Sequence, residues 1–345
     1  MAESIKTEII SPPSGETERA VRWGIIGCGD VTEVKSGPAF QKTKHSELIA
    51  VMRRNAEKAA DYAHRHGVPK WYADADQLIA DPDINAIYIA TPPGTHALYA
   101  IKAMQAGKPV YVEKPMAATY AECLEMLKVS KETGMPLNVA YYRRTLPAYL
   151  KAKELIENGT LGQILTVSIT LHKAADEHST SKDNWRLDPE IAGGGLFYDL
   201  ASHQLDYLDF LFGPVTEVNG MACNKAGYYE AEDTVSAIFT FKNGVIGTGN
   251  WCFVVDQSAE QDKIEISGTK GRLSLPCFAH GELELRTHKG IEHFGFTNPV
   301  NISHNLVRNV IQSLRGEELC VSTGESAART NRVLEEIVSN YYKNS

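Results

Sequence analysis

The chain has 345 residues, of which 43% are hydrophobic and 23% charged, and its formal net charge is −8. These are ordinary globular values, the length predicts two domains of about 150 residues each, and an acidic surface argues against a nucleic-acid partner. The six cysteines form no CxxC pair and the eleven histidines no HExxH motif, so no metal site is expected.

The first 20 residues are polar and are interrupted by the pair Pro12-Pro13. They lack the basic start and apolar middle of a secretory signal peptide. No apolar run in the chain approaches the roughly 20 residues that span a bilayer. Residues 1–20 are therefore expected to be a flexible tail, and the protein to be cytoplasmic and without a membrane partner.

From residue 21 onward, short apolar runs alternate with helical patterns. Asn55 is expected to cap a helix that runs toward residue 66, and a second helix is expected at about 95–106. Strands and helices that alternate in this way form βαβ units around a parallel sheet, so residues 21–142 are expected to be an α/β Rossmann domain. Its strands are expected at 22–26, 48–52, 86–90, 109–112 and 137–140.

The pattern changes after about residue 142, where strands begin to predominate. Asn243-Gly244 and Lys270-Gly271 are typical of turns between antiparallel strands. Residues 143–345 are therefore expected to form an α+β domain in which helices cover one face of a large, mostly antiparallel open sheet. Strands are expected at 164–171, 215–222, 234–241, 245–253, 263–267 and 283–286, and helices at 146–158, 196–212, 302–315 and 326–342.

A glycine-rich turn, Gly27-Cys28-Gly29, follows the first expected strand directly, and Asp30 and Val31 open the helix after it. In this context backbone N–H groups can approach a pyrophosphate at the helix N-terminus. The turn therefore predicts a dinucleotide site rather than a purely structural βα connection. Thr32 stands where the motif has Gly or Ala, a departure that weakens it slightly.

Arg53 and Arg54 end the second expected strand, where an acidic residue would bind the ribose 2′-hydroxyl of NAD. No carboxylate is present there, and two guanidiniums suit a 2′-phosphate, so NADP is favoured as the cofactor. The alternative is a pair of solvated arginines at a strand end, which leaves NAD possible.

Further motifs occur in both halves of the chain. The segment 90–96 ends one expected strand, 112–115 with its Glu-Lys-Pro run ends the next, and 193–203 places an Asp and a His four residues apart after a glycine run. With the glycine turn and a C-terminal pattern at 314–325, these motifs resemble the Gfo/Idh/MocA oxidoreductase family over roughly residues 21–342. The resemblance implies that Thr91, Pro92, His96, Glu113 and Lys114 bind the cofactor, in addition to the residues of the glycine turn and the two arginines.

Oxidation of an alcohol needs a hydride acceptor and a base for the hydroxyl proton. The ordinary pKa of histidine suits His203 for that exchange, and Asp199, one helical turn earlier, is near enough to orient the imidazole. Lys114 leaves the carboxyl end of a parallel strand, where its ammonium could polarise the reacting oxygen. The resemblance assigns these three residues to one catalytic site in a cleft between the domains. Taken singly, each is more often a solvated charge or a surface contact, and Asp206 is expected to be a structural hydrogen-bonding group.

Substrate contacts are expected from two further segments and from the Asp/His pair. Tyr142, Arg143 and Arg144 follow the last Rossmann strand, near which similar family members meet their substrates. We expect contacts from Tyr142 and Arg144, although Arg144 is equally expected to be a salt-bridge partner that joins the domains. Trp185 and Arg186 precede the glycine run and could offer a stacking face and a hydroxyl-binding fork.

The expected function is hydride transfer between a nicotinamide cofactor and a hydroxyl or carbonyl group of a sugar, polyol or related small molecule. The broad sheet is expected to bury one face against another subunit, as in similar proteins, in a homodimer or homotetramer. Two other functions remain open. One is a glycosidase-type enzyme that holds its cofactor tightly and acts by transient oxidation, and the other is a non-enzymatic dinucleotide sensor.

Overall fold

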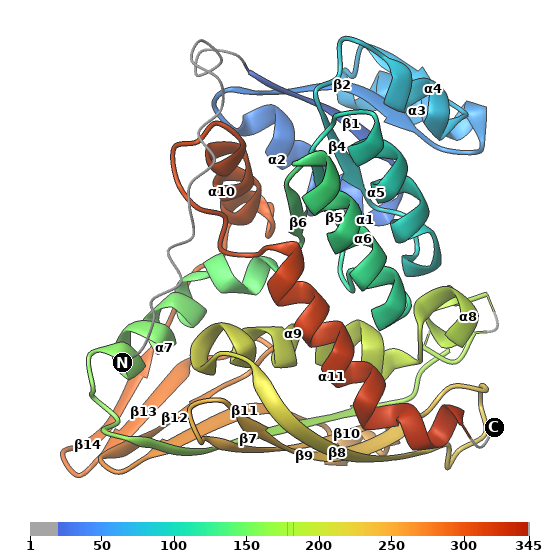
Figure 1. The fold of residues 1–345 in the computed structure, drawn as a ribbon. Helices are drawn as coiled ribbons and strands as arrows, with labels where there is room; N and C mark the ends of the chain where they lie inside the picture. Colours follow the sequence, from blue (N-terminus) through green and yellow to red (C-terminus); the bar gives the residue numbers. More distant parts are fainter. Residues whose placement is uncertain (1–19, 178, 182, 344–345) are drawn as a thin grey trace.

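The computed structural model describes residues 20–177, 179–181 and 183–343. The expected N-terminal tail therefore lies, apart from Ala20, outside the described residues. Figure 1 shows a compact α/β unit packed above a broad second sheet, with helices between the two.

The N-terminal sheet has six strands in the order β3-β2-β1-β4-β5-β6, and all of its neighbours are parallel. Its central strands consist of apolar residues that are buried, because helices cover both faces. This confirms the α/β class of the first domain. The strands are β1 (Val21–Ile26), β2 (Ser46–Met52), β3 (Lys70–Tyr72), β4 (Ala86–Ile89), β5 (Val110–Val112) and β6 (Leu137–Val139).

The helices of this unit begin and end with side-chain and glycine caps. The Asn55 side chain accepts a hydrogen bond from the Lys58 N–H, which confirms the predicted cap. Helix α6 is not among the predicted helices, although Thr119 and Glu122 form a capping box at its start and Gly134 ends it. The helices are α1 (Asp30–Val34), α2 (Gly37–Lys42), α3 (Ala56–His66), α4 (Ala75–Ala80), α5 (His96–Gln105) and α6 (Tyr120–Thr133).

The second sheet has eight strands in the order β14-β13-β12-β11-β7-β10-β9-β8. Its neighbours are antiparallel except for the central pair β7 and β10, which is parallel. The mostly antiparallel sheet and both predicted turns are confirmed, while β12 and β14 are additional. The strands are β7 (Ile164–Ala174), β8 (Val215–Cys223), β9 (Thr234–Phe241), β10 (Ile246–Val255), β11 (Gln261–Gly268), β12 (Gly271–Leu275), β13 (Leu283–Thr287) and β14 (Gly290–Phe294).

Helices cover only one face of this sheet (Figure 1). Alternate residues of β7 are buried against them, as the period of two in a strand requires. The remaining helices are α7 (Pro147–Glu157), α8 (Pro189–Ala192), α9 (Leu196–Phe212), α10 (His304–Leu314) and α11 (Gly324–Tyr342).

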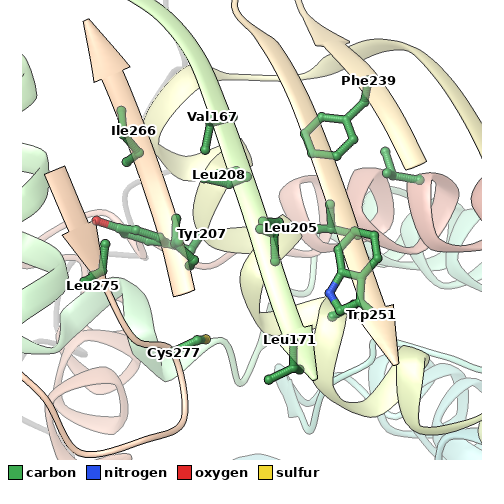
Figure 2. Packing of buried hydrophobic residues seen from close by; sticks show 14 of the residues in the cluster. Val167, Leu171, Leu205, Tyr207, Leu208, Phe239, Trp251, Ile266, Leu275 and Cys277 are labelled. Atoms are coloured by element: carbon green, nitrogen blue, oxygen red, sulfur yellow. The ribbon is translucent and has the colours of Figure 1, made fainter. Parts of the chain in front are cut away.

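Helix α9 lies between the eight-stranded sheet and the N-terminal unit. Figure 2 shows Leu205 and Leu208 of α9 against Val167 and Trp251 of the sheet. The Trp251 indole also donates a 2.8 Å hydrogen bond to Gln204 on the same helix. Because both sides of α9 are packed, the direction of its polar side chains is fixed by the core.

Candidate active site

The turn after β1 has the geometry of a phosphate-binding turn. Gly27 has φ +96°, and a Cβ there would lie 2.9 Å from the backbone nitrogen of Thr91, so only glycine fits. Gly29 precedes α1 without a side-chain cap, and a Cβ on it would meet no atom within 4 Å. The open space above the turn, beside Asp30 and Val31, therefore suits a dinucleotide pyrophosphate.

Arg53 lies beside this turn at the end of β2. Its Nη1 donates to the Cys28 carbonyl oxygen over 3.3 Å, and its side chain is half-buried. Arg54 is exposed. In the part of the chain that the structure describes, neither guanidinium forms an ion pair with a carboxylate, which leaves both charges available near the turn.

His96 was expected to contact the cofactor, but its side chain is buried. Its ring is 0% exposed, with Nε2 2.6 Å from the Thr91 carbonyl oxygen and Nδ1 3.0 Å from that of Pro115. Burial lowers the pKa of His96 to about 4, so the ring is neutral. The prediction of a direct contact is corrected, because His96 instead links the loops that follow β4 and β5, while Thr91 and Pro92 stay nearer the surface.

The Glu113 carboxyl group is hydrogen-bonded to a side chain of the neighbouring strand β4 and to the backbone of the next residue. The Tyr88 hydroxyl donates to Glu113 Oε1 over 2.5 Å, and the Lys114 N–H donates to Oε2 over 3.3 Å. Burial raises the pKa of Glu113. These contacts fix the backbone from which the Lys114 side chain leaves.

Lys114 crosses from the N-terminal unit to helix α9. Its Nζ donates to Asp199 Oδ1 over 2.5 Å and to the Asp199 carbonyl oxygen over 2.9 Å. Arg186 Nε lies 3.3 Å from the other carboxylate oxygen, and its guanidinium stacks 4.4 Å above the Trp185 ring. Burial alone would raise the pKa of Asp199, but the charges of Lys114 and Arg186 hold it below its usual value.

His203 follows Asp199 by one helical turn, a rise of about 6 Å, so the structure brings Lys114, Asp199 and His203 together. The expectation that Asp199 orients the imidazole is corrected, because its carboxylate is bound by Lys114 and Arg186. His203 Nδ1 has no hydrogen-bond partner in the part of the chain that the structure describes.

The His203 ring is surrounded by aromatic rings and is 5% exposed. It packs edge-on to Tyr142, Tyr141 and Phe278, with centroid distances of 5.3, 6.0 and 6.0 Å. Burial, with the positive charges of Arg143, Lys114 and Lys35, lowers the pKa of His203 well below its usual value. The ring is therefore neutral at neutral pH, the form that can accept a proton.

Arg144 is not available to a substrate. It is 3% exposed, and its guanidinium binds the Asp206 carboxylate over 2.8 and 2.7 Å and the Val321 carbonyl oxygen over 2.7 Å. Its predicted role in substrate binding is corrected, and the salt-bridge alternative is confirmed. Asp206 is the structural group that was predicted, and burial raises its pKa to about 6.

Arg143, Phe278 and Lys35 are near His203 but are not among the predicted site residues. Arg143 and Arg144 lie in a 3₁₀ turn, where consecutive side chains point about 120° apart, so one contacts the loop at Cys277 and the other contacts Asp206. The adjacent Arg-Arg pair itself does not reveal which is which. Phe278 lies in a loop that is distant in the sequence, and no motif around it marks it as a site residue.

The described residues contain no candidate metal site. Among them, no group of three or more His, Cys, Asp or Glu side chains is placed so that it could hold a metal ion. Within the same ranges, no helix combines the length and apolar character needed to cross a membrane.

Comparison with known proteins places the chain in a family. A model described as "Oxidoreductase family, NAD-binding Rossmann fold" matches residues 21–141, and one described as "GFO/IDH/MocA C-terminal domain" matches residues 149–274. Oxidoreductase P35 of Formosa agariphila is 38% identical over 320 residues, which cover 92% of this chain and 98% of that protein. The 1,5-anhydro-D-fructose reductase of Ensifer adhaerens is 29% identical, with coverage of 88% and 91%.

A solved structure agrees with these matches. The WlbA dehydrogenase of Bordetella pertussis, in complex with NADH and UDP-GlcNAcA, has a TM-score of 0.82 and 27% identity and covers 95% of this chain and 97% of its own. The two family models together span both halves of the chain in order. The protein belongs to the Gfo/Idh/MocA family and is an NAD(P)-dependent oxidoreductase.

Proposed function

We propose that this enzyme transfers a hydride between a nicotinamide cofactor and a hydroxyl or carbonyl group of a sugar, polyol or related small molecule. The observation that carries the proposal is the Lys114–Asp199 pair, which joins the two halves of the chain one helical turn from the neutral ring of His203. Relatives named as a 1,5-anhydro-D-fructose reductase and as a dehydrogenase in complex with a sugar nucleotide support a carbohydrate-like substrate. Neither is named as a glycosidase or a regulator, so those alternatives are not favoured.

The proposed roles follow from the contacts. A bound nicotinamide supplies the hydride acceptor or donor. In the oxidising direction His203 accepts the hydroxyl proton, and Lys114 donates a hydrogen bond to the reacting oxygen. Asp199 holds Lys114 in place through its carboxylate and its carbonyl oxygen. Tyr142, Trp185 and Arg186 are proposed to contact the substrate.

The cofactor is proposed to lie on the glycine turn. Gly27, Gly29, Asp30 and Val31 would receive the pyrophosphate, while Thr91, Pro92, Glu113 and Lys114 would line the remainder of the site. Arg53 and Arg54 favour NADP(H), since their guanidiniums pair with no carboxylate of the described residues and stand where a 2′-phosphate would need positive charge. His96 contributes through the loops that it links.

We also propose that residues 21–142 bind the cofactor and that residues 143–345 bind the substrate and a second subunit. The sheet face opposite the helices carries exposed apolar side chains on three neighbouring strands, Met221, Ile238 and Ile246. Exposed apolar side chains on one sheet face are a feature of subunit interfaces. Light scattering during size exclusion would give a monomer mass if this part of the proposal is wrong.

The test of the reaction is a substrate screen combined with one substitution. Aldoses, inositols and anhydro-sugars are offered with NAD or NADP, and reduced nicotinamide is followed by absorbance. His203→Asn is expected to lower turnover by about 10²- to 10⁴-fold, the usual contribution of general acid–base catalysis, with little change in cofactor affinity. His288→Asn, in an exposed turn, is the matched control. Near-normal turnover in His203→Asn would show that another group, with Tyr142 the first alternative, carries the proton.

A further inference from the structure

Arg143 is a buried cation without a carboxylate partner. Arg143 is 6% exposed. Its guanidinium donates two hydrogen bonds to the Cys277 carbonyl oxygen, from Nε over 3.1 Å and from Nη2 over 2.8 Å. Nη1 donates to the Tyr142 hydroxyl over 2.6 Å. In residues 20–177, 179–181 and 183–343, no Asp or Glu forms an ion pair with it. Its neighbour Arg144, equally buried, has the Asp206 carboxylate.

The surroundings of Arg143 compensate its charge only in part. A buried ion costs several kcal/mol of desolvation unless an opposite charge and hydrogen bonds offset it. The Tyr142 and Phe278 rings lie 5.0 and 4.5 Å from the guanidinium carbon, and such cation–π contacts offset a fraction of that cost. Asp262 binds the same loop, but its carboxylate accepts the backbone N–H groups of Cys277, Phe278 and Ala279.

Two hydrogen-bond donors of Arg143 have no partner among the described residues. A guanidinium has five N–H groups. One on Nε and one on Nη2 are used by Cys277, and one on Nη1 is used by Tyr142. One N–H is left on each terminal nitrogen, and a guanidinium can bind the two oxygens of a carboxylate through one N–H of each terminal nitrogen.

The position of Arg143 ties this charge to the proposed reaction centre. The two rings that flank the guanidinium, Tyr142 and Phe278, are two of the three rings that pack edge-on to His203. Phe278 also borders an open pocket of about 250 Å³ whose lining includes one basic and two acidic side chains, Lys173, Glu260 and Asp262. A single aromatic ring therefore separates the guanidinium of Arg143 from the imidazole that is proposed to accept the proton.

The charges around His203 are predominantly positive, although the whole chain carries −8. Lys114 and Arg186 share the single carboxylate of Asp199, and Arg143 adds a further unpaired charge. Glu113 is a second acidic group nearby, hydrogen-bonded to the Tyr88 hydroxyl and the Lys114 N–H, and burial raises its pKa. A neutral sugar would leave this excess uncompensated, whereas an anionic group would balance it.

We propose that the substrate is a sugar acid, such as a uronate or an aldonate, whose carboxylate is bound by Arg143 beside the carbon that reacts. This inference rests on the proposed oxidoreductase function and names its substrate class. Arg143 then determines specificity, while Lys114 serves the reacting oxygen.

The experiment compares substrates that carry a carboxylate with matched neutral substrates. Uronic acids, their neutral methyl esters and the corresponding aldoses are assayed with NADP and NAD in the wild-type enzyme, in Arg143→Met and in Arg143→Lys. The wild type is expected to prefer each acid to its ester by about tenfold to 100-fold in kcat/KM, the contribution of a charge-assisted pair of hydrogen bonds. Arg143→Met should abolish this preference, mainly through KM for the acid, and Arg143→Lys should restore part of it. Arg286→Met, which removes an exposed arginine from β13, should keep the wild-type preference.

The outcomes separate this inference from the proposed function. Turnover of esters and aldoses that equals or exceeds that of the acids in the wild type overturns the sugar-acid inference and leaves the oxidoreductase proposal standing, even if the Arg143 variants do not fold. No turnover of any sugar with either cofactor refutes the proposed function. In that case calorimetric titration of a uronate and its ester into the wild-type protein with NADPH decides the binding claim, and equal affinity refutes it.

Discussion

Glu232 provides a quantitative test of the forces that hold the start of helix α9. Its carboxyl group is fully buried, and its oxygens accept the Gly195 N–H over 3.0 and 3.1 Å and a hydrogen bond from the Tyr342 hydroxyl. Gly195 is the N-cap of α9, the helix that carries Asp199 and His203. Burial outweighs these hydrogen bonds and raises the pKa of Glu232 from 4.5 to about 7.

This shift makes stability depend on pH in a defined direction. Between about pH 4.5 and pH 7 the folded protein keeps a proton on Glu232 that the unfolded chain has lost. The free energy of unfolding therefore falls as pH rises through this window. A shift of about 2.5 pKa units corresponds to about 3 kcal/mol. Glu232→Gln keeps an acceptor for the Gly195 N–H but cannot ionise, so it should lose this part of the dependence.

The assay is urea unfolding, followed by tryptophan fluorescence, at about pH 4.5 and at pH 8. Asp206 also has a raised pKa and contributes to both proteins, so the informative quantity is the difference between wild type and variant. The wild type is expected to lose about 3 kcal/mol more than Glu232→Gln over this interval. Glu325→Gln, at an exposed position in the first turn of α11, should behave like the wild type. Identical pH profiles for wild type and Glu232→Gln would refute the reasoning.

Three further predictions follow from the site. Arg144→Met leaves the buried Asp206 unpaired and should lower the free energy of unfolding by about 3–5 kcal/mol in urea titrations. Adding Asp206→Leu should recover most of that loss, and failure to recover would show that the pair itself is not the cause. Arg53→Asp should shift cofactor preference toward NAD(H) by at least about tenfold in fluorescence titrations, because a carboxylate repels a 2′-phosphate; an unchanged ratio would remove Arg53 from the cofactor site. Lys114→Met should lower turnover strongly, and Lys114→Met with His203→Asn should lose less than the two single losses combined; full additivity would mean that the two groups act independently.

The sequence predicts most of the fold because its strands are strongly marked. The buried strands β1, β2 and β4 are apolar runs that end at turn residues, and helix α9 begins and ends at the predicted residues. The strand β3 is short and lies at a sheet edge, where its partly exposed residues carry no alternating pattern. Helix α6 has a weak apolar stripe, but its capping box and terminal glycine were readable signals.

For the candidate site, the sequence predicts which residues share a helix face but not the contacts between them. The four-residue spacing of Asp199 and His203 shows that they share a helix face. It does not show that Lys114, from the other half of the chain, would reach the carboxylate. For the same reason His96 is buried between two loops, a tertiary arrangement that no local pattern encodes.

The parallel pairing of β7 with β10 has a consequence for the order in which the molecule folds. Parallel neighbours need a crossover connection, and here the crossover is the chain from residue 175 to residue 245, which contains helix α9. The β7–β10 pair at the centre of the eight-stranded sheet can therefore form only after this long crossover connection is positioned. This is a slow, non-local step in folding. Asp199 and His203 reach their places in that same step. A newly made chain would thus acquire its proposed reaction centre late, together with the last long-range contacts of the sheet.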